Sequence, residues 1–211
     1  MKKNFGAKPF LYPQPVLIIA TYGADGTPDA MNAAWGGIAD TNRIAMYLSA
    51  SHKTVKNILE RRAFTVSMAD EAHVVEADYV GIVSANNVPD KLEKAGLHTT
   101  KSEFVDAPCI DELPMTLECR LVSFDPESEL LLGEIVNVSA DEKVLTDGEI
   151  DPAKLRPITF DPVGHTYIKT AVYTFCRLVK NLMQTSMYTE ELPMRSHRIS
   201  ILSIHIPRNI F

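Results

Sequence analysis

The first third of the chain alternates short apolar runs with turn residues, a pattern typical of antiparallel strands. Residues 16–22 form an almost continuous apolar run that ends at the turn 23–26, and a second segment begins at Pro28. A Gly- and Asp-containing turn between two such segments predicts a hairpin. Residues 44–49 and residues 64–68 have the β-type composition and alternation that predict two further strands.

Two stretches have helical rather than strand spacing. Apolar residues at 55, 58 and 59 predict a short helix over residues 54–61. Residues 72–94 are expected to be mainly helical, with a turn at 86–89 and a second short helix over 90–95 that Gly96 ends. The face expected to be buried in the first of these two helices contains Val74, Val75, Tyr79, Val80 and Val83.

The strand and turn signals in the second half of the chain favour a β-barrel. Residues 115–124 and 130–139 flank the turn 125–128 and predict a second hairpin, and turn clusters follow at 147–152 and 162–165. Antiparallel strands with a few outer helices favour a closed or half-closed β-barrel over a doubly wound sheet. The glycine-rich fingerprints of Rossmann and P-loop proteins do not occur, which argues against both classes.

Composition narrows the classes of function. A chain of 211 residues with 45% hydrophobic residues supports one sizeable core, and its 27 acidic against 21 basic residues argue against a general nucleic-acid surface. Lys2 and Lys3 precede no apolar run of signal-peptide length, and no segment approaches membrane-spanning length. We therefore expect a cytoplasmic protein that binds neither nucleic acid nor membrane.

Cysteine and histidine spacing gives no sign of a metal site. Cys109, Cys119 and Cys176 share no C-x-x-C spacing, and the six histidines form no metal-binding motif. We expect reduced, buried cysteines and no metal.

Residues 31–54 carry the main candidate site. Asn32, Ala33, Ala34 and two glycines surround Trp35, the one tryptophan, so a planar ligand could reach main-chain groups directly. Downstream, hydroxyls and one ammonium lie in a turn that leads into a helix, where backbone N–H groups attract anions; the residues concerned are Ser49, Ser51, Lys53 and Thr54. This combination is typical of a monophosphate site. The alternative is an ordinary strand and turn with a Ser/Thr helix cap.

Five motifs in order along residues 1–170 resemble the flavin reductase-like family: Tyr12-Pro13-Gln14-Pro15-Val16, Asn32-Ala33-Ala34-Trp35-Gly36, Ser49-Ala50-Ser51-His52-Lys53-Thr54 with Asn57, Asp78-Tyr79-Val80-Gly81 and Gly164-His165-Thr166-Tyr167. The resemblance implies an FMN-binding Greek-key split β-barrel, a homodimer, and redox chemistry that the flavin carries.

The resemblance also assigns roles to residues. Ser51, Lys53 and Thr54 would hold the FMN phosphate, Ser49 and Asn57 would lie near the ribityl chain, and residues 32–35 would follow the edge of the isoalloxazine ring. Ala50, in the same motif, would also contact the cofactor. Tyr12, Pro15 and Tyr167 would line the ring, although aromatic residues there could equally belong to the core or a dimer interface, as could Trp35. His165 would contact flavin or substrate, or cap its loop. Asp78 and Lys91 are polar positions near the pocket that the resemblance implies, but on an exposed helix each is expected to be an ordinary solvated charge, so neither is assigned a role.

The function implied is an oxidoreductase that moves electrons from NAD(P)H or a redox protein through FMN to an acceptor, with no side-chain nucleophile. A non-catalytic flavin-binding storage or sensing module is the alternative. A pyridoxamine-phosphate-oxidase type of split barrel is disfavoured, because residues 32–35 and 51–54 resemble the flavin reductase branch.

The resemblance ends near Thr170. One choice of codons for residues 175–182, read two bases on, encodes Leu-Ser-Ile-Gly-Lys-Glu-Leu, which resembles a family C-terminus. We therefore interpret residues 171–211 as a divergent tail produced by a frameshift, and resequencing independent clones tests this. The alternative is a native helix over 173–187 followed by a strand over 199–206.

Overall fold

A computed structural model describes residues 1–170, which form one compact unit. The predictions for Cys176, for the tail and for its alternative helix and strand lie outside the described residues. Within the described range, no helix combines the length and apolar character needed to span a bilayer.

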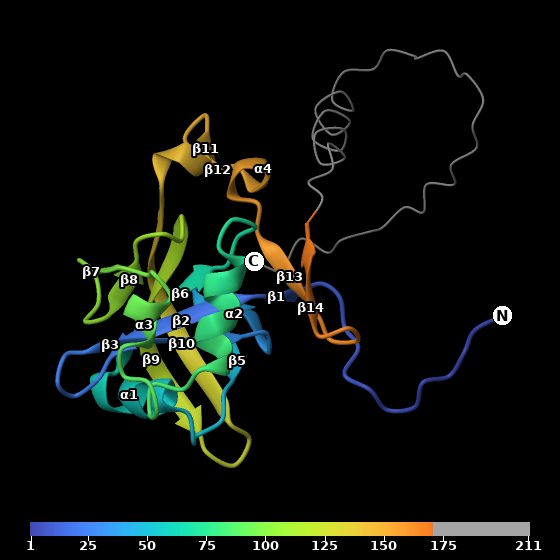
Figure 1. Cartoon of the computed structure of the whole chain (residues 1–211), viewed down its shortest axis with the longest axis horizontal. Coiled ribbons are helices and arrows are strands. Elements are labelled where there is room, and N and C mark those ends of the chain that lie inside the picture. Colours follow the sequence, from blue (N-terminus) through green and yellow to red (C-terminus); the bar gives the residue numbers. More distant parts are fainter. Residues whose placement is uncertain (171–211) are drawn as a thin grey trace. The chain divides into compact units, whose positions relative to one another are not determined.

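A curled sheet of seven antiparallel strands forms the framework (Figure 1). Its spatial order is β3-β2-β6-β9-β10-β5-β4, so it combines the hairpin pairs β2-β3, β4-β5 and β9-β10 with pairings between strands that are distant in the sequence. This half-barrel confirms the expected split β-barrel architecture. The strand bounds are Leu17–Tyr22 (β2), Pro28–Ala33 (β3), Gly36–Asp40 (β4), Arg43–Tyr47 (β5), Ala63–Met68 (β6), Met115–Asp125 (β9) and Leu130–Ala140 (β10).

Three smaller sheets accompany the main one. A three-stranded sheet joins the two ends of the described chain, with β13 between β1 and β14, and two hairpins pair β7 with β8 and β11 with β12. Their bounds are Gln14–Pro15 (β1), Ile158–Asp161 (β13), Thr166–Lys169 (β14), Thr99–Lys101 (β7), Pro108–Ile110 (β8), Leu145–Thr146 (β11) and Glu149–Ile150 (β12).

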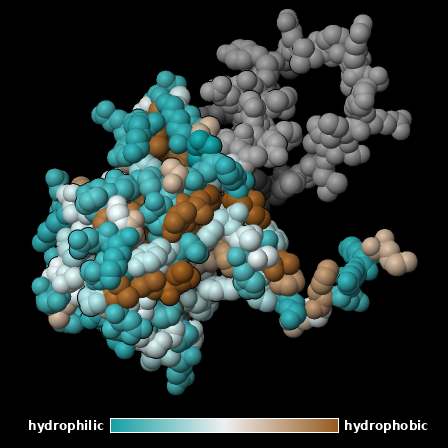
Figure 2. Space-filling view, viewed as in Figure 1, coloured by the Kyte–Doolittle hydropathy of each residue, from teal (hydrophilic) through white to brown (hydrophobic). Residues whose placement is uncertain are grey.

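The helices are short, and two of them position the candidate site. They are α1 (Lys53–Arg61), α2 (Val74–Ile82), α3 (Lys91–Lys94) and α4 (Pro152–Leu155), with a 3₁₀ turn at Glu142–Val144. The short helix predicted over 90–95 is confirmed as α3, but the helix before it is shorter than predicted, because α2 ends at Ile82, ahead of the predicted turn at 86–89. The predicted buried face is also wrong at Val75, which is exposed, whereas Ala77 and Val80 are buried. The face that carries α2 accordingly shows strips of apolar residues between polar ones (Figure 2).

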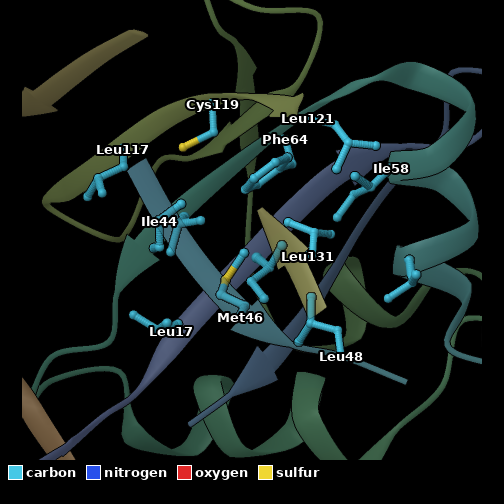
Figure 3. Close-up of a cluster of buried hydrophobic side chains, with 13 residues drawn as sticks. Leu17, Ile44, Met46, Leu48, Ile58, Phe64, Leu117, Cys119, Leu121 and Leu131 are labelled. Carbon is cyan, nitrogen blue, oxygen red and sulfur yellow. The ribbon is translucent and has the colours of Figure 1, made fainter. Parts of the chain in front are cut away.

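The main core fills the concave side of the sheet. Apolar side chains from β2, β5, β6, β9 and β10 converge with Val55 and Ile58 of α1, and the Phe64 ring lies among them, fully buried (Figure 3). Removing this much apolar surface from water is the main stabilising contribution to such a sheet. The core also fixes the orientation of α1 and therefore of the turn that precedes it.

Of the two described cysteines, only Cys119 belongs to this interior, so the expectation of buried cysteines is wrong for Cys109. Cys119 is buried in the main core and Cys109 is half-buried, and neither forms a disulfide. Burial raises the pKa of Cys109 to about 11 and that of Cys119 to about 12. Because the thiolate is the reactive form, neither side chain has the character of a redox nucleophile.

Candidate functional site

One continuous groove runs between β3, the turn before α1, and α2. Two cavities, of about 270 and 260 Å³, make up its length. They share the wall residues Met31, Asn32, His52, Gly81 and Ile82, so they join into one elongated site.

The first cavity is the cationic end of the groove, which we define by His52, Lys53, Thr54, Ser84 and Lys91. Lys53 is the first residue of α1, and it forms no salt bridge with any residue of the described range. The first turn of α1 contains no acidic residue, and no side chain caps it. The helix dipole and free backbone N–H groups therefore lie at this end together with an ammonium that forms no salt bridge among the described residues, although its charge also acts on Asp25. This arrangement is suited to a phosphate.

The turn before α1 is not an ordinary Ser/Thr helix cap. The N-cap residue is His52, and the Ser49 and Ser51 hydroxyls lie 3.0 Å apart and hydrogen bond with each other. The backbone N–H of Ala50 donates to the Glu129 carboxylate at 3.3 Å. The simple capping alternative is therefore excluded. Ser49, Ala50 and Ser51 do not line either cavity, so their contact with a ligand stays a prediction.

The second cavity is the aromatic end, which we define by Trp35, Tyr47, Phe160 and Tyr167. Ala33 and Ala34 line it as well, beside Asn32. The Trp35 side chain is 45% exposed, which excludes the interpretation of Trp35 as ordinary core. A flat apolar ligand would find aromatic side chains and open backbone at this end of the groove.

A chain of hydrogen bonds crosses the aromatic end. Tyr167 donates its hydroxyl proton to Asp78 at 2.8 Å, and the Asn32 amide nitrogen donates to the Tyr167 oxygen at 3.2 Å and to the carbonyl of Ala77 at 3.0 Å. Burial, followed by the hydrogen bond to Asp78, raises the pKa of Tyr167 well above its usual value, so the phenol stays protonated. Both amide hydrogens of Asn32 are in use, which leaves its oxygen free to accept.

Gly81 makes this arrangement possible. A Cβ at Gly81 would lie 2.9 Å from the Cβ of Asn32, closer than non-bonded carbon atoms approach. Only glycine therefore lets α2 approach β3 while Asn32 keeps its place in the groove. Together the two ends match a ligand with an anionic group at one end and a planar ring at the other.

The other predicted ligand residues lie away from the groove. Tyr12 donates its hydroxyl to Asp161, and Pro15 lines a neighbouring apolar cavity of about 610 Å³ that also contacts Trp35 and Tyr47. Asn57 is 2% exposed, and its amide nitrogen lies on the side of α1 that faces Gly23. His165 occupies a turn with a φ of 53°. Ligand contacts by these four residues stay predictions.

Several groove residues were not predicted as ligands. His52 lies within one of the five motifs but has no predicted role, and Asp78 and Lys91, although predicted to lie near the pocket, were expected to be solvated charges. Asp78 is exposed as expected but lies in the groove wall, whereas Lys91 is only 3% exposed, so its expectation is wrong. The signal for Asp78 was its motif with Gly81. No local signal marks Lys91, because its burial depends on how the segment before α3 packs.

Comparison with known proteins agrees with this geometry. A family model described as "Flavin reductase like domain" matches residues 10–162. Flavoredoxin of Desulfovibrio vulgaris (Miyazaki F) is similar in structure, with 39% sequence identity, a TM-score of 0.79, and coverage of 82% of this chain and 95% of that chain.

Two more distant relatives follow. Flavoredoxin from Methanosarcina acetivorans is 25% identical with a TM-score of 0.72, covering 82% of this chain and 92% of that chain. An uncharacterised protein of Aquifex aeolicus (strain VF5) is 26% identical over 159 residues, 69% of this chain and 79% of the relative. Because the family model spans most of the chain, the protein belongs to the flavin reductase-like family of split-barrel, flavin-related oxidoreductases.

Proposed function

We propose that this protein binds FMN in the groove and acts as an oxidoreductase, passing electrons from NAD(P)H or a redox protein through the flavin to an acceptor. The observation that carries the proposal is the continuity of the groove, with a lysine that forms no salt bridge at a helix N-terminus at one end and four aromatic side chains at the other. FMN has a phosphate at one end and a planar ring system at the other, matching that order.

The chain's residues would bind and orient the cofactor. Lys53 and the first N–H groups of α1 would hold the phosphate, with the Lys91 ammonium beside them. The free amide oxygen of Asn32 would accept a hydrogen bond from the polar edge of the ring. When bound, the flavin supplies hydride and single-electron chemistry, and the protein controls orientation and water access.

We propose a cytoplasmic homodimer. An apolar cavity of about 680 Å³ opens between the edge strand β4 and strands β9 and β10. Ile38 in β4 is 67% exposed and Val138 in β10 is 46% exposed at its walls. A second copy covering this face would remove apolar surface from water at a sheet edge. Light scattering coupled to size-exclusion chromatography tests the dimer, and a monomer at micromolar concentration contradicts it.

The first experiment is a visible absorption spectrum of the purified full-length protein, with chromatography of any released ligand. We expect FMN, either bound on purification or taken up when added. NADH or NADPH is then added without oxygen. Bleaching of the flavin supports a pyridine-nucleotide donor, and a stable oxidised flavin directs the search to protein donors. A protein that takes up no flavin contradicts the proposed function.

Lys53→Gln is expected to weaken FMN binding at least tenfold, about 1.4 kcal/mol, because a charge-assisted hydrogen bond to the phosphate is lost. Riboflavin lacks the phosphate, so its affinity should change little. Fluorescence titration of flavin-free protein measures both affinities. Lys56→Gln is the matched control, since it removes the same charge from an exposed position of the same helix. Equal losses for FMN and riboflavin would show that Lys53 does not hold the phosphate.

A further inference from the structure

Three buried polar side chains meet behind the cationic end of the groove. Asp29 of β3, Thr54 of α1 and Lys91 of α3 are 3%, 2% and 3% exposed. The Lys91 ammonium lies 3.0 Å from Oδ1 of Asp29, and the Thr54 hydroxyl donates to Oδ2 of Asp29 at 2.6 Å. One carboxylate therefore joins three elements that are far apart in the sequence.

The Asp29 carboxylate interacts with two donor groups, the Thr54 hydroxyl and the Lys91 ammonium, that a bound phosphate would otherwise use. Thr54 has a single hydroxyl hydrogen, which it donates to Asp29, so its oxygen can only accept. Lys91 donates to the carbonyl of Val83 at 3.2 Å and faces Asp29 with a second N–H. Its third N–H remains for the cavity, which Lys91 and Thr54 both line. Asp29 therefore competes with any anion in the cavity for the same two side chains.

The contact between Lys91 and Asp29 allows such competition. Oδ1 of Asp29 accepts no hydrogen bond of good geometry, so its interaction with Lys91 is that of two charges rather than a directed bond. An ammonium is a compact charge with rotatable donors on a flexible stem. It can therefore face a second anion without breaking a bond of fixed direction.

We propose that Asp29 is the resident counter-ion of Lys91 and that it weakens the hold of the groove on the FMN phosphate, so that FMN exchanges with solution. This inference rests on the proposed function and deepens it. In the ligand-free protein, Asp29 prevents the buried ammonium from being left unpaired, a situation that is strongly unfavourable. In the complex, the carboxylate and the phosphate share the ammonium, and their mutual repulsion lowers the affinity. Asp29 acts through Lys91 and is a positioning residue.

Asp29→Asn tests the proposal, because it removes the charge and keeps the shape. The amide oxygen can face Lys91, and the amide nitrogen can donate to Thr54, which releases the hydroxyl hydrogen of Thr54. We expect the preference for FMN over riboflavin, measured by fluorescence titration of flavin-free full-length protein, to rise at least tenfold. The release of FMN should slow correspondingly.

Asp90→Asn is the matched control. It makes the same substitution one residue before Lys91, at an exposed side chain that pairs with Lys94 at 3.0 Å, and should leave the preference unchanged. A purely structural role for Asp29 would lower stability without raising the preference for FMN. A preference within twofold of wild type, or a lower one, therefore overturns the proposal.

Two further measurements test the proposal if Asp29→Asn folds poorly. If Asp29→Asn is recovered only with FMN bound, its rate of FMN release is compared with that of wild type, and an equal or faster rate overturns the proposal. If Asp29→Asn is not recovered at all, Lys91→Gln is measured instead. Lys91→Gln should lower the preference for FMN over riboflavin at least tenfold, and an unchanged preference overturns the proposal. Wild-type protein that binds neither flavin contradicts the proposed function, whereas wild-type protein that prefers FMN, together with an unchanged preference in Asp29→Asn, contradicts only this inference.

Discussion

Asn32→Asp is expected to weaken the binding of both FMN and riboflavin at least a hundredfold, about 2.7 kcal/mol. The substitution preserves size and removes the only side-chain donor that Asn32 contributes. The amide nitrogen that donates to Ala77 and Tyr167 becomes an oxygen that faces a carbonyl and a phenolic oxygen. A partly buried acceptor without a donor is strongly unfavourable, and here it also carries a charge.

The charge matters because Asp78 lies on the other side of Tyr167. The phenol has one proton, which it donates to Asp78 in the native arrangement, and it cannot serve two carboxylates at once. We therefore expect the introduced carboxylate to turn toward the groove, where it meets the ring of the cofactor. Titration of flavin-free protein measures the affinities, and circular dichroism verifies the fold.

Two comparisons make this prediction specific. Because the effect arises at the aromatic end, FMN and riboflavin should lose affinity by the same factor, unlike in Lys53→Gln. Adding Asp78→Asn to Asn32→Asp should recover part of the loss, since one carboxylate then remains beside Tyr167. A variant that retains wild-type affinity would place the ring elsewhere.

Two of the hairpins of the main sheet, β2-β3 and β9-β10, were predictable because their signals are local. Alternation in residues 115–124 and 130–139 gave β9 and β10, and the turn at 23–26 gave β2 and β3. Strand β4 was not predicted, because Gly36, Gly37 and Asp40 have low strand propensity and only pairing with β5 makes them a strand. Strands β13 and β14 were missed as well, since β13 pairs with β1, about 145 residues earlier, and β14 pairs with β13.

The candidate site likewise contains some residues that the local sequence indicates and others that only tertiary packing brings there. Lys53 and Thr54 were predictable from a strand, a polar turn and a helix in succession, and residues 32–35 from their small side chains around Trp35. Lys91 was not, because nothing near it in the sequence indicates that Asp29 will lie 3.0 Å away. Its burial follows from the packing of α3 against β3, which is a tertiary property.

Gly133 shows how closely the core constrains the sheet. It lies in β10 at a shift of register between β9 and β10, and the ring of Phe64 packs over it. A Cβ at this position would overlap Cζ of Phe64 and would lie 3.1 Å from Cε1 of the same ring and 3.3 Å from Cγ2 of Ile44. Phe64 is fully buried in the main core, so its ring has little space into which it can move.

Gly133→Ala is therefore expected to lower the free energy of unfolding by about 3 kcal/mol, the upper part of the usual range for overpacking a core. Urea denaturation followed by circular dichroism measures the loss. Phe64→Leu in the same chain is the informative partner, because a smaller side chain makes room for the added methyl group. The double variant should lose less stability than the sum of the two single variants, since the two sites are in contact. Simple additivity would mean that the ring moves aside at little cost, and that Phe64 does not require glycine at position 133.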